Sequence, residues 1–190
     1  MVLNPDYDQI LQISQIEDLL SMGVDALFIN PVDWKGIRPA LEEAARAGVP
    51  VFVVDAPVYD DSLVTSTVVS DNRDAGKLAA MDLQRRLDGG NIVILDHPTN
   101  KPSIDRVEGF RSVIETDSRF TIVSQLSAFG TLEGAMPVME NALQAHPDID
   151  VVFGSNDPTC QGAVAVLVAS NRYKDVLVYG VDGSPEGKDM

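Results

Sequence analysis

Short apolar runs that end at a side chain capable of hydrogen bonding recur six times along the chain. They are Ala26–Asn30, Val49–Asp55, Thr67–Asp71, Ile92–His97, Val151–Asn156 and Val176–Asp182. Most are nearly continuous in Val, Ile, Leu and Phe, as in strands buried on both faces of a parallel sheet. Ligands bind beyond the carboxyl ends of such strands. The polar residues there are therefore the first site candidates: Asn30, Asp55, Asp71, Asn72, Asn156 and Asp182.

Segments with helical spacing separate the runs. Ile10, Ile13, Leu19 and Leu20 share one face of a helix over about residues 8–22, which Gly23 would end. Further helices are expected over residues 37–45, 75–87, 105–116, 131–144 and 159–170, with N-caps at Asp105, Thr131 and Thr159. This alternation predicts an α/β chain in which helices cover both sides of parallel sheets.

An irregular stretch over residues 57–62 leads into a β-branched run and then into Ser70, Asp71 and Asn72. We read this stretch as an extended crossing segment and place a boundary between two lobes near Ser70. A purely structural interpretation of Asp71 and Asn72 is that they cap the helix that follows. Capping and ligand contact are compatible roles.

Charge and composition narrow the possible functions. The chain has 190 residues, 45% of them apolar, and a formal charge of -15. Nucleic acids and anionic lipid surfaces bind proteins rich in Lys and Arg, so neither is an expected partner of this acidic chain. No apolar stretch is long enough to span a membrane, and the first residues do not resemble a signal peptide.

Motifs for common catalytic chemistry are missing. One cysteine and two histidines offer neither an internal disulfide nor zinc-ligand spacing. Gly76-Lys77 lacks the other residues of a phosphate-binding loop, and no GxGxxG or GxSxG sequence follows a strand. We therefore expect no metal and no cofactor.

Four residues have both a functional and a structural interpretation. His97, beside Asp96, is the best candidate for a general base, but a loop histidine at the rim of a cleft is the simpler interpretation. Cys160, at a helix start, is either a reactive thiol or a packed core residue. Trp34 and Phe129 could stack on a ring or cover the end of a core.

Several pieces of the sequence occur together in a known order and spacing. They are Ile29-Asn30-Pro31-Val32-Asp33, Val53-Val54-Asp55, Ser70-Asp71-Asn72, Arg106-Val107-Glu108-Gly109-Phe110, Gly154-Ser155-Asn156-Asp157 and Tyr179-Gly180-Val181-Asp182-Gly183. Across nearly the whole chain they resemble periplasmic sugar-binding proteins of the ribose-binding class. Those proteins are receptors of ABC transporters and are related to the effector domains of LacI-type repressors.

The resemblance implies an α/β fold of two doubly wound parallel-sheet lobes, joined by a hinge, with a monosaccharide or polyol held in the cleft. The N-terminal lobe would be residues 1–70, without its first strand and helix, and the C-terminal lobe residues 71–190, nearly complete. The implied ligand-binding residues are Asn30 and Asp55 in the first lobe and Arg106, Phe129, Asn156, Val181 and Asp182 in the second. Ser70 and Asp71 would lie at the hinge.

Two departures from the family qualify these expectations. Ribose binders usually follow the aspartate at position 55 with an arginine, whereas this chain has Ala56, which favours another pentose, a hexose or a polyol. The absent first strand of the family would lie beside Ala26–Ile29 and leave backbone groups unpaired there. We expect this lobe to rearrange, or to borrow structure from another copy by domain swapping.

The leading hypothesis is therefore a non-enzymatic receptor that passes a monosaccharide or polyol to an ABC-transporter permease. The parent protein would be periplasmic or extracellular, although no signal peptide is present in this chain. Two alternatives stay open. One is a sugar-sensing domain of a LacI-type repressor or a sensor kinase, and the other is an enzyme on a doubly wound fold that uses His97.

Overall fold

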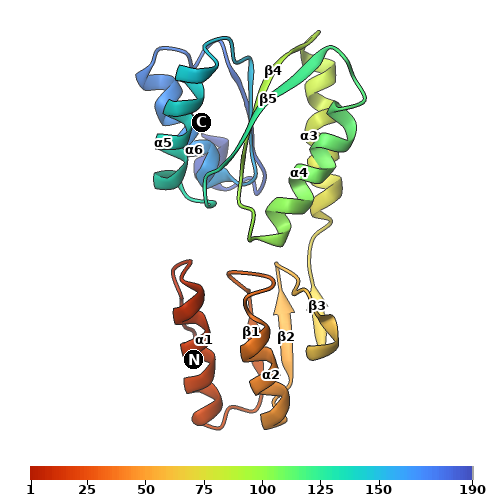
Figure 1. The fold of residues 1–190 in the computed structure, drawn as a ribbon, viewed down its shortest axis with the longest axis vertical. Coiled ribbons are helices and arrows are strands. Elements are labelled where there is room, and N and C mark those ends of the chain that lie inside the picture. Colours follow the sequence, from red (N-terminus) through yellow and green to blue (C-terminus); the bar gives the residue numbers. More distant parts are fainter. Residues whose placement is uncertain (190) are drawn as a thin grey trace. The chain divides into compact units, whose positions relative to one another are not determined.

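The computed structural model describes residues 1–189, which form two compact units (Figure 1). Unit 1 comprises Met1–Ser70 and Thr99–Pro102, and unit 2 comprises Asp71–Pro98 and the chain from Ser103 onward. Each unit has a parallel sheet of its own. Within residues 1–189, every helix is too short or too polar to cross a membrane.

Unit 1 contains a three-stranded sheet. Its elements are α1 (Gln9–Ser21), β1 (Leu27–Ile29), α2 (Arg38–Ala47), β2 (Val51–Val54), the 3-10 helix η1 (Asp61–Leu63) and β3 (Ser66–Val68). All neighbours are parallel in the order β1-β2-β3, with Leu27 opposite Val51 and Phe52 opposite Ser66. The carboxyl ends of β1 and β2 therefore meet at one edge.

Helices cover only one face of this sheet. Leu27, Ile29, Val51 and Val53 pack in one core with side chains of both α1 and α2. The opposite face presents Phe28, stacked on Phe52 at 5.0 Å, together with exposed Val54 and Val68. The expectation of helices on both sides is therefore wrong for unit 1. Apolar side chains line the uncovered face nonetheless.

The predicted face of α1 is right except for one residue. Ile13, Leu19 and Leu20 pack against the core, together with buried Ile16. Ile10 is instead 81% exposed, and Gln12 is buried and bonds to the loop after β1. Met1–Leu3 lie outside every strand.

Unit 2 has a four-stranded sheet in the order β5-β4-β6-β7, with every neighbouring pair parallel. Its elements are α3 (Asn72–Arg86), β4 (Gly90–Asp96), α4 (Lys101–Ile114), β5 (Phe120–Ser127), α5 (Leu132–Ala145), β6 (Val151–Gly154), α6 (Asp157–Ala169), β7 (Leu177–Tyr179) and α7 (Pro185–Lys188). The first two residues of α4 belong to unit 1. The central strands β4 and β6 are almost wholly buried.

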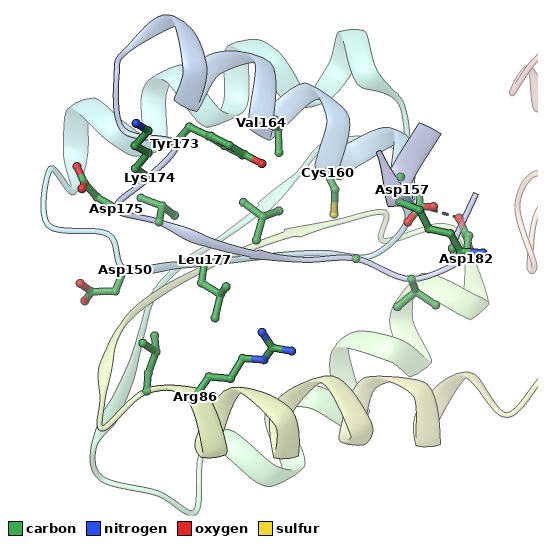
Figure 2. A pocket seen from close by; sticks show the side chains of 18 of the residues that line it. Arg86, Asp150, Asp157, Cys160, Val164, Tyr173, Lys174, Asp175, Leu177 and Asp182 are labelled. Carbon is green, nitrogen blue, oxygen red and sulfur yellow. Dashed lines mark hydrogen bonds between the residues drawn. The ribbon is translucent and has the colours of Figure 1, made fainter. Parts of the chain in front are cut away.

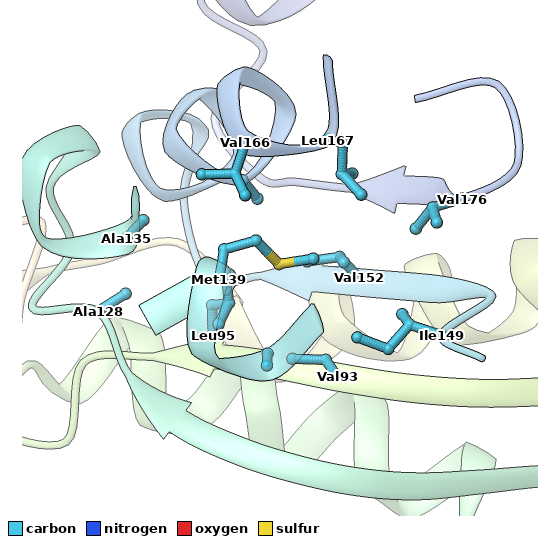
Figure 3. Close-up of a cluster of buried hydrophobic side chains, with 12 residues drawn as sticks. Val93, Leu95, Ala128, Ala135, Met139, Ile149, Val152, Val166, Leu167 and Val176 are labelled. Atoms are coloured by element: carbon cyan, nitrogen blue, oxygen red, sulfur yellow. The ribbon is translucent and has the colours of Figure 1, made fainter. Parts of the chain in front are cut away.

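Alternate residues of the central strands enter two separate cores. Val93, Leu95 and Val152 pack with α5 and α6 around the fully buried Met139 (Figure 3). Ile92, Ile94 and Phe153 face α3 and α4, and the Phe153 ring stacks on Phe110 with centroids 4.2 Å apart. The predicted two-sided covering is thus confirmed for unit 2.

Strand β5 is missing from the six predicted runs. Its sequence, Phe-Thr-Ile-Val-Ser-Gln-Leu-Ser, mixes polar and apolar residues because β5 lies at an edge and is only half-buried. An edge strand satisfies its polar side chains in solvent and needs no continuous apolar run. The pattern used to find the other strands could therefore not detect it.

The predicted helix caps were partly right. Thr131 caps α5 as expected, with its hydroxyl oxygen accepting from the Gly134 N–H at 3.0 Å. Asp105 lies inside α4, which begins four residues earlier, at Lys101. Thr159 lies in the first turn of α6, whose cap is Asn156. Asp71 caps α3 and accepts from the Asp74 N–H at 2.9 Å.

Replacing Thr131 with alanine should lower the free energy of unfolding by about 1 kcal/mol, because a backbone N–H at the start of α5 loses its acceptor. Urea denaturation followed by circular dichroism measures this loss. Thr131→Ser retains the oxygen and should recover most of the stability. Equal losses in both variants would contradict the capping role.

Candidate functional site

The guanidinium of Arg106 lies at the centre of a polar network in unit 2. Arg106 extends from α4, and its side chain is only 13% exposed. Nε donates to the Asn72 side-chain oxygen at 2.8 Å, and Nη1 donates to the Ser155 carbonyl at 2.7 Å. Nη1 also lies 3.1 Å from the Asp182 carboxylate. Residues from four segments of the unit thus meet at one planar donor group.

Asp182 supplies the negative charge of this network. It follows β7 by three residues and has a positive φ of 112°, which is uncommon for a residue with a side chain. Partial burial raises the pKa of Asp182 above the ordinary aspartate value, and the charge of Arg106 opposes that rise. The Asp157 backbone N–H donates to its second oxygen at 3.4 Å. The carboxylate is held by the protein while part of it faces solvent.

Asn156 connects two loops at the same edge of the sheet. Its side-chain oxygen caps α6, and its Nδ2 donates to the Gly130 carbonyl at 2.9 Å. Phe129, which directly precedes Gly130, is 62% exposed and, like Asp182, has a positive φ, of 53°. Strained backbone of this kind concentrates at functional sites. Val181, by contrast, is partly buried against the core beside α3 and α4.

Three buried hydroxyl oxygens near this edge have no hydrogen-bond partner within the described part of the chain. They belong to Ser127 at the end of β5, Ser155 after β6 and Thr159 in α6. Unpaired buried polar groups are uncommon in native proteins and call for a specific explanation.

In unit 1, the two predicted ligand-binding residues contact each other directly. Asn30 follows β1 and Asp55 follows β2, and the Asn30 Nδ2 donates to the Asp55 carboxylate at 3.1 Å. Both residues are exposed, and Asp55 has a positive φ of 69°. An amide and a carboxylate are thus presented side by side at the carboxyl edge of the sheet.

Gln12 holds the loop that carries Asn30. Its side-chain amide donates to the Asn30 carbonyl at 2.8 Å, and its oxygen accepts from the Val32 N–H at 2.9 Å. Gln12 is buried, although it reads as a polar surface residue in the sequence. Sequence reasoning missed it because the rotation of α1 decides whether a glutamine faces solvent or the sheet.

The comparison with protein families decides the relationship. The family model described as "Periplasmic binding protein domain" matches residues 1–190. This chain belongs to the periplasmic binding protein domain family.

Curated and solved members of the family agree with that assignment. The ribose import binding protein RbsB of Bacillus subtilis (strain 168) is 36% identical over 188 residues, which cover 98% of this chain and 60% of that protein. A galactofuranose binding protein of known structure has a TM-score of 0.91 at 31% identity and covers 97% of this chain and 66% of its own. The fructose binding periplasmic domain of a hybrid two component system has a TM-score of 0.92 at 27% identity, covering 97% and 62%.

The chain spans about 60% of the length of the curated relatives that it matches. Its periplasmic binding protein fold has two parallel sheets and is partial relative to those full-length relatives. The α/β fold class expected from the sequence, with an incomplete first lobe, is therefore confirmed.

Four other residues considered in the sequence of this periplasmic binding protein lie outside the two polar clusters. Ser70 is exposed, and Ala56 is buried after β2. His97 is buried rather than at a rim, and its backbone N–H donates to the Ser103 hydroxyl at 2.9 Å. Trp34 packs edge-on against Tyr59 at 5.3 Å.

Cys160 is a packed core residue, not a reactive thiol. Burial raises its pKa to about 12, so the thiol stays protonated at neutral pH. Among residues 1–189 no three His, Cys, Asp or Glu side chains are grouped so that they could hold a metal ion.

A hollow of about 990 Å³ lies along the outer side of β7 (Figure 2). Its lining combines aliphatic strand residues with Arg86, Tyr173 and Lys174, and it touches the polar network only near Asp157 and Asp182. Neither Arg106, Asn156 nor Phe129 lines it. Two candidate residues, Val181 and Asp182, lie at its margin, but the hollow does not contain the rest of the candidate site.

Two carboxylates with a strongly lowered pKa, Asp82 and Asp117, lie away from the network. Asp82 on α3 accepts from the Tyr179 hydroxyl at 2.8 Å, and this bond, with those from Arg85 and Arg86, lowers the pKa of Asp82 to about 2. The contact joins α3 to β7. Structural ion-pair networks shift pKa values as active sites do, and we assign Asp82 a structural role.

Proposed function

We propose that this protein is the sugar-binding component of an ABC transporter, and that it binds a monosaccharide or polyol without catalysis and without a cofactor. The main observation in support is the partly buried Arg106 held between Asn72, Ser155 and Asp182 at the carboxyl edge of the unit 2 sheet. The names of its relatives, which include ribose and galactofuranose binding proteins, also support it. The family further supports a periplasmic location and a transporter permease as partner.

The ligand-binding groups of this proposal come from both sheets. Asn30 and Asp55 contribute from unit 1, and Arg106, Asn156 and Asp182 from unit 2, with Phe129 and Val181 as apolar contacts. Ser70 and Asp71 serve as the hinge. Sugar hydroxyls both donate and accept, so carboxylates would take their protons while Arg106 and the amides donate to their oxygens. Charge-assisted bonds of this kind are the strong ones.

A ligand panel tests the proposal. Thermal unfolding is measured with pentoses, hexoses and polyols, because a ligand that binds only the folded state raises stability with its concentration. We expect a concentration-dependent rise in Tm with at least one compound, and ribose need not be the best because Ala56 replaces the usual arginine. The absence of any shift across the panel, at millimolar concentration, would contradict sugar binding by this chain.

As the pH is lowered, sugar affinity should begin to fall at a pH above about 3.9, the ordinary pKa of aspartate. The pKa of Asp182 is raised in the sugar-free protein, so this carboxyl gains a proton earlier than a free aspartate and loses its pairing with Arg106. Calorimetric titrations from pH 7.5 downward measure the fall. Asp182→Asn should bind weakly at every pH and lack this early fall. An unchanged profile in the variant would exclude Asp182 as the titrating group.

We also propose that the protein self-associates through unit 1, with exchange of structure between copies as the expected form. Exposed Phe28, Val54 and Val68 on the uncovered sheet face, with Phe52 half-buried beneath Phe28, support this, because parallel sheets normally have both faces covered. Size-exclusion chromatography with light scattering should give a dimer. A monomer that melts cooperatively would contradict the proposal.

A second candidate is a sensory role. The similar fructose binding domain belongs to a hybrid two component system, which favours a periplasmic sensor domain as the alternative. Both roles require the same sugar binding. They differ in the polypeptide attached to the domain, so the gene that encodes this chain distinguishes them: a kinase region indicates the sensor, and a neighbouring permease gene indicates the transporter.

A further inference from the structure

We infer that Asn72 is a positioning residue, which sets the orientation of Arg106 for the sugar and links it to the segment after Ser70–Asp71. This inference rests on the proposed function for its effect on affinity. Asn72 is the first residue of α3 and is 6% exposed. Its side-chain oxygen accepts from Arg106 Nε at 2.8 Å.

The geometry of the guanidinium explains why one acceptor matters. Nη1 is already shared between the Ser155 carbonyl and the Asp182 carboxylate. A planar guanidinium held at Nη1 alone can still rotate about that contact, and a second contact at Nε fixes its plane. With both in place, the outward N–H groups have a defined direction toward a ligand.

Close packing of α3 against α4 keeps Asn72 at this distance. A Cβ atom at Gly76 would lie 1.9 Å from the Arg106 carbonyl oxygen, and one at Gly109 would lie 2.0 Å from the Arg73 carbonyl oxygen. The two backbones therefore approach as closely as glycine allows. Beside them, Arg73 pairs with Glu108 at 2.6 Å. The start of α3 cannot move relative to Arg106 without breaking this packing.

Asn72 also lies next to the proposed hinge residues in the chain. Asp71, the cap of α3, comes directly before it, and Ser70 is the last residue of unit 1 before that cap. Asn72 therefore joins the segment that follows Ser70 to Arg106 through a single hydrogen bond.

The test compares Asn72→Leu, which removes the acceptor at similar volume, with Asn72→Asp, which retains it. Asn72→Leu should weaken binding of the best sugar from the panel about tenfold, the usual loss when a bond to a charged group is removed. Asn72→Asp should recover most of the affinity. Arg73→Ala is the matched control, because it removes a neighbouring contact between α3 and α4 and should bind within about twofold of the wild type.

A spectroscopic readout separates this inference from the proposed function. In 15N-labelled protein without sugar, the Arg106 Nε–H resonance, assigned with Arg106→Lys, should be protected from exchange with solvent. Protection should vanish in Asn72→Leu and persist in Asn72→Asp. The inference is wrong if Asn72→Leu leaves both the protection and the affinity unchanged. If Asn72→Leu does not fold, Asn72→Asp decides, and loss of protection in that variant also contradicts the inference. If the wild type binds no sugar, the resonance alone decides.

Discussion

Replacing Arg106 with lysine should weaken binding of the best sugar about 100-fold. A hydrogen bond to a charged group contributes about 1.5 to 3 kcal/mol, and every 1.4 kcal/mol is about tenfold in affinity. Lysine keeps the charge but cannot reproduce the planar fork that reaches Asn72, Ser155 and Asp182 together. Isothermal titration calorimetry measures the loss.

Arg111→Lys provides the matched control on the same helix. Arg111 donates to the Gln125 side-chain oxygen at 2.6 Å and takes no part in the polar network. Its affinity should stay within about twofold of the wild type, since exposed contacts contribute little. Affinity of the Arg106→Lys variant within threefold of the wild type would contradict the role assigned to Arg106.

Replacing Gly109 with alanine should lower the free energy of unfolding of unit 2 by about 3 kcal/mol, at the upper end for overpacking. The new methyl group would lie 2.0 Å from the Arg73 carbonyl oxygen, and that oxygen belongs to a helix backbone that cannot turn aside as a side chain can. Urea denaturation measures the change. Separation of α3 from α4 should also weaken sugar binding, because Asn72 would move away from Arg106.

Leu78→Ala is the control for this change. Leu78 lies on α3 and is 59% exposed, so introducing alanine there removes little buried surface. Its stability should stay within about 0.5 kcal/mol of the wild type. If Gly109→Ala is no less stable than Leu78→Ala, the close approach of α3 and α4 does not constrain the unit.

The sequence predicted most of the fold because the buried strands carry continuous apolar runs. β2, β4 and β6 are read correctly for that reason, and the alternation with helices gives the α/β class. β5 escapes this reading because its polar residues are satisfied at the sheet edge. The burial of Gln12 on α1 also escapes, since its hydrogen bonds to the loop after β1 are long-range contacts that no local pattern shows.

The candidate site was predictable in part. The ends of the apolar runs identify Asn30, Asp55, Asn156 and Asp182, because parallel strands end at a common edge. Arg106 comes from a helix, and only the family resemblance points to it. Its hydrogen bond with Asn72 joins residues on two helices that are 34 positions apart in sequence, and no local pattern predicts such a contact.

A chemical-shift titration of 15N-labelled protein with the best stabilising sugar tests the central claim most directly. We predict saturable shifts concentrated at backbone amides near Asn30, Asp55, Asn156 and Asp182, together with the Arg106 Nε–H. Shifts confined to the part of the hollow around Arg86, Tyr173 and Lys174, or no saturable shift with any sugar, would contradict the account.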